Sequence, residues 1–138
     1  MSVEFKDFSI NVLGALNNTA LGVLEECAGE LESQVKRNTV VDTGKTKNSW
    51  THNVATTAEQ YVATIGSPEM NAIWEEFGTG EYALNGDGRK GGWYYEDERG
   101  KGHFTMGKHP RRPFWHAYTS LKNRIIKRIQ DAMKGGLS

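Results

Sequence analysis

Trp74-Glu75-Glu76-Phe77-Gly78-Thr79-Gly80 lies just past the middle of this chain of 138 residues. Two aromatic and two carboxylate side chains run directly into a Gly-Thr-Gly sequence, which has the composition of a turn. The residues before this stretch have the hydrophobic pattern of a compact scaffold, whereas residues 81–112 are rich in glycine and aromatic residues. We therefore predict that the stretch marks the point where a rigid framework passes into an adaptable extension.

One long helix is predicted before this stretch, over residues 8–37. Apolar residues recur there at steps of three and four, the spacing of a helix that buries one face. They are Leu13, Leu16, Ala20, Leu24, Cys27, Leu31 and Val35. Residues 48–66 predict a β-hairpin, because apolar and polar residues alternate along its second half. The next segment, 71–80, contains the central stretch, and its pattern is too short to distinguish a helix from a strand.

A loop, a second hairpin and a second helix are predicted after the central stretch. Residues 81–92 are turn-forming throughout, and two aromatic segments within residues 93–105 flank a polar turn. Apolar residues at helical spacing predict a helix over 114–134. The expected fold class is α+β: a small antiparallel sheet packed by a long N-terminal helix and a C-terminal helix, with residues 81–112 as a loop and β-hairpin excursion. The length indicates a single domain over residues 1–138.

The composition is that of an ordinary soluble protein, with 37% hydrophobic and 25% charged residues. No stretch approaches the roughly 18 apolar residues of a membrane-spanning helix, so we expect no membrane partner. The single cysteine, Cys27, excludes a disulfide within the chain and is expected to be buried. Because no Cys/His pair or H-E-x-x-H motif gives the spacing of metal ligands, we expect neither a metal nor another cofactor.

Charge is divided between the two parts of the chain, although the formal net charge is zero. Residues 1–80 carry 5 Lys/Arg against 11 Asp/Glu, whereas residues 81–138 carry 12 against 6. This division favours contact between the basic part of one copy and the acidic part of the next. The basic C-terminal helix also contains Trp115 and Tyr118. A nucleic-acid-binding protein that uses this helix is therefore an alternative hypothesis.

Asp42-Thr43-Gly44 is the motif in which aspartic proteases place their catalytic carboxylate, so peptidase activity is a further alternative. The next residue is Lys45, where that family has a small one. A cation beside the site would favour two ionised carboxylates over the shared proton that the mechanism needs. Two long helices are also foreign to an all-β protease. We interpret these residues as a turn after the first helix and assign no catalytic residue.

Three motifs, taken in order, resemble those of a family of tailed-phage proteins. They are Val41-Asp42-Thr43-Gly44-Lys45-Thr46-Lys47-Asn48-Ser49, then Glu76-Phe77-Gly78-Thr79-Gly80, then His103-Phe104-Thr105 with Pro110–Phe114 and Ala117. Their order and spacing over residues 10–134 resemble the gene-product-ten-like family of the lambdoid phage HK ninety-seven, which are neck or tail-completion proteins. The motif residues are Asp42, Thr43, Gly44, Ser49, Glu76, Phe77, Gly78, Thr79, Gly80, Pro113, Phe114 and Ala117.

The resemblance implies a structural subunit of the virion rather than an enzyme. Such a subunit would form a homo-oligomeric ring of roughly six or twelve copies at the junction of head and tail. Its expected partners are itself, a head-completion or connector protein and a tail-terminator or tail-tube protein, with phage DNA passing through the ring. We expect contacts with neighbouring subunits or with the DNA channel at Trp93, Tyr94, Tyr95, Arg111, Arg112, Arg124, Lys127 and Arg128.

Overall fold

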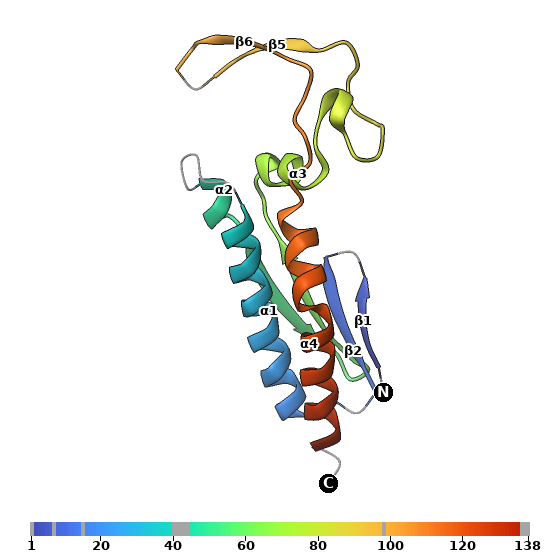
Figure 1. Ribbon diagram of the computed structural model, residues 1–138. Coiled ribbons are helices and arrows are strands. Elements are labelled where there is room, and N and C mark those ends of the chain that lie inside the picture. The colour runs from blue at the N-terminus through green and yellow to red at the C-terminus, as the bar shows by residue number, and fades with distance from the viewer. Residues whose placement is uncertain (1, 7, 15, 40–44, 98, 136–138) are drawn as a thin grey trace.

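Two long helices pack side by side against a four-stranded antiparallel sheet in the computed structural model, which describes residues 2–6, 8–14, 16–39, 45–97 and 99–135 (Figure 1). The helices are α1 (Asn18–Asn38) and α4 (Pro113–Gly135). The strands, in spatial order, are β1 (Ser2–Lys6), β2 (Ser9–Leu13), β4 (Gln60–Gly66) and β3 (Thr51–Thr56). We call these six elements the body. They confirm the α+β fold class expected from the sequence.

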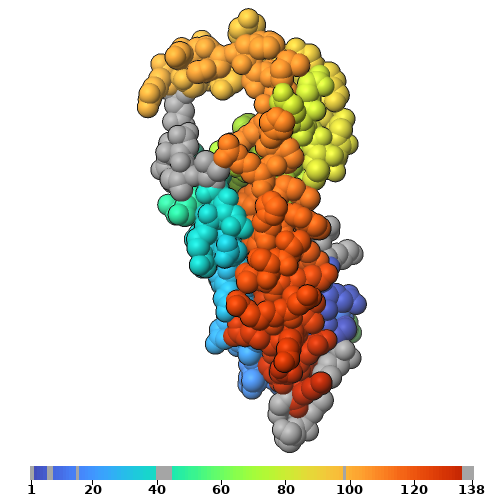
Figure 2. Space-filling view, in the orientation of Figure 1, coloured from blue at the N-terminus to red at the C-terminus, as the bar shows by residue number. Residues whose placement is uncertain are grey.

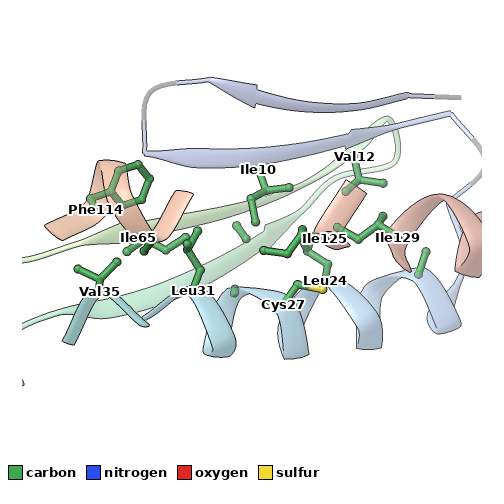
Figure 3. Close-up of a cluster of buried hydrophobic side chains, with 14 of the residues drawn as sticks. Ile10, Val12, Leu24, Cys27, Leu31, Val35, Ile65, Phe114, Ile125 and Ile129 are labelled. Carbon is green, nitrogen blue, oxygen red and sulfur yellow. The ribbon is translucent and has the colours of Figure 1, made fainter. Parts of the chain in front are cut away.

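The hydrophobic core lies between the sheet and the two helices (Figure 3). Alternate residues of β2 and β4 point into it, because successive side chains of a strand face opposite sides of the sheet. These residues are Ile10, Val12, Ala63 and Ile65. The helices contribute Ala20, Leu24, Cys27, Ala28, Leu31, Val35, Ala117, Ile125, Ile129, Ala132 and Met133. Burial raises the pKa of the Cys27 thiol, so little of it is present as the reactive thiolate.

The predicted start of the first helix is wrong, because α1 begins at Asn18 rather than at residue 8. Residues 9–13 form β2, which pairs with β1 on one side and with β4 on the other. Two hydrogen-bonded ladders outweigh the helical spacing that begins at Leu13, since that spacing is a weak local preference. The chain turns after β2 at Gly14, whose φ of 105° lies in the left-handed region that favours glycine.

The remaining elements lie close to their predicted bounds. β3 and β4 form the hairpin predicted within residues 48–66, and α4 is the helix predicted over 114–134. The segment that the pattern left undecided is a helix, α3 (Met70–Phe77), followed by a turn and a short 3-10 helix, η1 (Gly80–Tyr82). A four-residue helix, α2 (Lys45–Asn48), precedes β3. The sequence pattern did not predict β1.

Residues 83–105 leave the body beyond α3, and we call them the arm (Figure 1). The arm contains a hairpin of β5 (Trp93–Glu96) and β6 (Gly102–Thr105), which is the aromatic hairpin predicted from the sequence. In the space-filling view the arm stands clear of α1 and α4 (Figure 2). The arm therefore projects from the end of the body at which α4 begins.

The start of α1 is fixed by a side chain. Asn17 has an extended backbone, and its Oδ1 accepts a hydrogen bond of 2.8 Å from the N–H of Ala20. The first N–H groups of a helix have no partner within the helix, so this bond satisfies one of them.

We predict that Asn17→Ala lowers the free energy of unfolding by about 0.5–2 kcal/mol, because it removes this cap. Asn18→Ala, at the exposed position next to it, should leave the free energy unchanged or raise it slightly, since alanine is the better helix former. Urea unfolding of the two variants measures the difference. Equal effects would contradict a helix that begins at Asn18, because both asparagines would then be interior.

Candidate functional site

Two segments that are far apart in the sequence meet at the N-terminal end of α4. They are residues 75–82 and residues 106–114, and we call their meeting place the junction. The Glu76 side chain lies at its centre with only 2% of the residue exposed. Glu76 Oε1 accepts hydrogen bonds from the N–H groups of Phe114, at 2.7 Å, and Trp115, at 3.4 Å. Glu76 thus caps α4 across the junction, with its negative charge at the positive end of the helix dipole.

Arg112 faces the same carboxylate. Its Nε lies 3.4 Å from Glu76 Oε2, and its guanidinium carbon lies 4.6 Å from the centroid of the Trp115 ring. The φ of Arg112 is 55°, a value that is uncommon outside glycine, so the chain turns sharply just before α4. Burial raises the pKa of Glu76, while the hydrogen bonds from Phe114 and Trp115 and the charge of Arg112 oppose the rise.

On the other side of the junction, Glu75 binds the segment that leads from the arm back to α4. Its carbonyl oxygen accepts hydrogen bonds from the N–H groups of Arg111, at 2.8 Å, and Arg112, at 3.1 Å. Its buried carboxylate forms an ion pair with Lys108 Nζ. Glu75, through its carbonyl oxygen, and Glu76, through its carboxylate, therefore both position the backbone that leads into α4.

Thr79 joins the two segments of the junction by two hydrogen bonds with Lys108, one through its backbone and one through its side chain. Its N–H donates to Lys108 O at 2.9 Å, and its Oγ1 accepts from the Lys108 N–H at 2.8 Å. The N–H of Glu81 donates to Met106 O at 2.9 Å. Gly80, with a φ of 61°, lies so close to this segment that a Cβ would meet Met106 O. Only glycine permits this backbone conformation together with this approach.

The structure brings the second motif and the Pro110–Phe114 part of the third together at the junction, whereas His103-Phe104-Thr105 lies on β6 in the arm. Phe77 packs edge-on against Phe8, whose ring centroid lies 4.5 Å from that of Phe114. Pro113 and Ala117 are buried beside them. Gly78, with a φ of 74°, ends α3 and donates its N–H to Trp74 O at 2.8 Å.

The described part of the first family motif, Lys45–Ser49, lies in α2 and the turn that follows it. Ser49 Oγ donates to Thr46 O at 2.6 Å and lies 2.6 Å from Ser67 Oγ, so it fixes the turn between α2 and β3. Asp42, Thr43 and Gly44 are outside the described residues, as is the active site that the protease hypothesis would place on them.

The turn at the tip of the arm is organised by Asp97. Its Oδ1 accepts hydrogen bonds of 2.9 Å from the N–H groups of Arg99 and Lys101, and its Oδ2 lies 2.8 Å from His103 Nε2. The hydrogen bonds with His103 and with the Lys101 N–H lower the pKa of Asp97. Asp97 therefore holds Arg99 and Lys101 of the polar turn and connects them to His103 on β6.

Aromatic side chains of the arm are exposed. Of the three predicted contact residues on β5, Tyr94 is 80% exposed, Tyr95 is 46% exposed and Trp93 is partly buried. Phe104 lies opposite Tyr94 in the hairpin and is 54% exposed. Phe104 was not among the contact residues predicted from the sequence, although pairing β5 with β6 across the predicted turn would have placed it beside Tyr94.

The basic residues proposed as contacts are in three settings. Arg124 and Arg128 bind acidic residues of the same chain: Glu30 accepts from both, at 2.7 and 2.8 Å, and Glu26 accepts from Arg128 at 2.7 Å. Arg112 faces Glu76 within the junction, as described above. Lys127 and Arg111 are exposed. Several of the opposite charges expected to attract neighbouring copies thus already attract each other between α1 and α4.

No group of three or more His, Cys, Asp or Glu side chains is placed to bind a metal ion in the described part of the chain. His103 is paired with Asp97, and His109 stacks on Tyr82 with 3.7 Å between the ring centroids. None of the helices in the described ranges combines the length and the apolar character that a membrane crossing requires. The arrangement at the junction holds one segment of the chain against another.

We predict that Glu76→Ala lowers the free energy of unfolding by about 1–3 kcal/mol, because the N–H of Phe114 would be buried without its acceptor. Glu59→Ala, at an exposed glutamate between β3 and β4, is the control and should change it little. Urea unfolding measures both. Equal small effects would show that the carboxylate does not support α4.

The pH dependence of stability gives a second test of Glu76. Folding raises its pKa, so the folded protein binds this proton more tightly than the unfolded chain does. The resulting stabilisation is full below the unfolded-state pKa and is lost as the pH rises through the raised folded-state pKa. Glu76→Gln keeps an oxygen acceptor and lacks this titration. The free energy of unfolding of the natural protein, minus that of Glu76→Gln, should therefore fall with rising pH, and a difference that rises would contradict the assignment.

The sequence matches the family described as "Bacteriophage HK97-gp10, putative tail-component" over residues 9–78. The match covers just over half of the chain, from β2 to the residue that ends α3, Gly78. No curated protein and no solved structure matches. The resemblance to this family is thereby confirmed over residues 9–78, which include the first motif and Glu76–Gly78 of the second. The chain belongs to the HK97-gp10-like family of bacteriophage tail components.

Proposed function

We propose that this protein is a structural subunit of a neck or tail-completion ring, which joins head and tail during assembly of the virion. Membership of a family of phage tail components supports a virion protein that contacts other virion proteins. The observation that carries the finer proposal is the arm, which leaves the body at a fixed junction and exposes aromatic side chains.

The arm has the properties of a segment that binds a neighbouring protein. A hairpin of two strands is marginally stable by itself in water. This one exposes Tyr94, Tyr95 and Phe104, and exposed aromatic surface of this kind typically marks a contact region. Covering these side chains on a neighbour would remove apolar area from water and stabilise the hairpin at the same time.

The junction supports a contact with a defined direction. Glu75, Glu76 and Thr79 bind the segment that returns from the arm, so both ends of the arm are fixed to the body. A contact repeated at a constant angle from copy to copy closes into a ring when the rotation allows it. If DNA passes through that ring, the exposed Arg111 and Lys127 are the basic residues that we propose to face it.

An armless variant tests the proposal. Residues 84–104 are replaced by a short Gly-Ser linker, which is feasible because Glu81 and Met106 are already hydrogen-bonded to each other. We expect light scattering to give a mass of roughly six or twelve subunits for the full chain and of one subunit for the armless variant. The unfolding midpoint of the armless variant should be similar to that of the full chain when both are monomeric, because the core and the Glu76 hydrogen bonds are retained.

Two results would contradict the proposal. One is a full chain that remains monomeric at every protein concentration and salt concentration. The other is an armless variant that assembles as the full chain does, since the ring would then form without the segment that we propose to build it.

A further inference from the structure

We propose that Asn85, in the arm, is a site of spontaneous deamidation, by which its side-chain amide is converted to a carboxylate. The reaction needs neither an enzyme nor a cofactor, because the nucleophile is the backbone nitrogen of Gly86 and the other reactant is water. Asparagine is among the chemically labile residues of proteins. The inference goes beyond the proposed function and does not depend on it, since a single copy of the chain contains both reacting groups.

The reaction proceeds through a cyclic imide. The nitrogen of Gly86 loses its proton and attacks Cγ of Asn85, the bond between Cγ and Nδ2 breaks, and the amide nitrogen leaves as ammonia after taking up a proton. Water then adds to either carbonyl of the ring and opens it to aspartate or to isoaspartate. No group is oxidised or reduced. The arm gains a negative charge beside Asp87, and isoaspartate also lengthens its backbone by one carbon.

The turn that contains Asn85 is exposed and is held by few bonds. Asn85 and its neighbour Leu84 are both exposed. The Gly86 N–H donates to Ala83 O at 3.0 Å, and the Leu84 N–H donates to Phe77 O at 2.8 Å. The first of these bonds must open before the Gly86 nitrogen can attack. Exposed segments with few buried contacts open locally at a small fraction of the free energy of global unfolding.

Gly86 leaves the attack unobstructed. It has no side chain to hinder the approach of its nitrogen to the Asn85 side chain. A Cβ added at this position would have no heavy atom within 4 Å outside the neighbouring residues. The backbone of Gly86 therefore has room to rotate into the geometry that closes the ring.

The next pair along the chain, Asp87-Gly88, has similar chemistry but less freedom. Aspartate followed by glycine forms the same cyclic imide by loss of water. Gly88, however, is packed against the start of η1, because a Cβ added there would meet the backbone of Gly80 and the side chain of Ala83. This packing restrains the nitrogen that would have to attack. We therefore expect the folded protein to react at Asn85 and to spare Asp87.

The other asparagines of the chain differ from Asn85 in two respects. Each of them precedes a residue that has a side chain, which hinders the attacking nitrogen. All except Asn17 lie in helices or strands, where hydrogen bonding fixes the backbone, and Asn17 caps α1. Sequence and structure thus select the same residue.

Incubation of the purified protein in mildly alkaline buffer tests the proposal, because base removes the proton from the Gly86 nitrogen. Peptide mapping by mass spectrometry should show progressive replacement of NH₂ by OH at Asn85, with Asp87 and the other asparagines unchanged. A methyltransferase specific for isoaspartate should label the same position. Asn85→Gln is the matched control. It keeps a neutral amide, but its longer side chain would have to close a larger ring, so both signals should be lost.

A synthetic peptide of residues 81–90 provides the reference, because it has the same sequence without the packing of Gly88. The incubation lasts until this peptide has converted. Conversion of Asn85 in the folded protein, with loss of both signals in Asn85→Gln, supports the proposal. An unchanged Asn85 in the folded protein would show that the turn prevents the attack, and the proposal would be wrong. Conversion of Asp87 or Asn71 in the folded protein at the rate of Asn85, or isoaspartate labelling that persists in Asn85→Gln, would also overturn it.

Discussion

The carboxylate of Glu76 connects the middle of the chain to its last helix. Glu76 lies in the last turn of α3, and its carboxylate accepts a hydrogen bond from the Phe114 N–H. This bond fixes the position at which α4 begins. That starting point sets which residues of α4 face α1 and complete the core against the sheet. A buried charge is costly unless hydrogen bonds and an opposite charge compensate it, and here two backbone N–H groups and Arg112 do so. The same group of contacts fixes both ends of the arm.

Local patterns predicted much of the body and of the arm. The stripe from Ala20 to Val35 faces the core, and the alternation along β4 and the polar turn between β5 and β6 both mark real hairpins. β1 and β2 were missed for a physical reason. Apolar and polar residues alternate along both, as in Val3-Glu4-Phe5 and Ile10-Asn11-Val12, but the helical spacing from Leu13 onward overlaps the end of β2. The ladder with residues 60–64, a partner distant in the sequence, stabilises β2 as a strand. Asn17, a good capping residue, was a signal for the true start of α1.

Part of the candidate site could likewise be predicted from the sequence, and part of it could not. Glu76 and Phe114 stand in motifs that the resemblance identified, but no pattern in either motif indicates that one caps the other. The ion pairs between the helices were more accessible to prediction. Glu26 and Glu30 are four residues apart on one helix, as are Arg124 and Arg128 on the other, so each pair lies on one helical face. Matching these two spacings would have indicated that the helices pair with each other.

The backbone bond between Glu81 and Met106 brings the two ends of the arm together at the edge of the body. For a loop whose ends are already close, each doubling of its length costs only about 0.6 kcal/mol in closure entropy. The arm is therefore a segment whose length and sequence can change with little effect on the register of the sheet or the packing of the helices. Substitutions and changes of length in the arm can therefore accumulate while the same framework continues to fold.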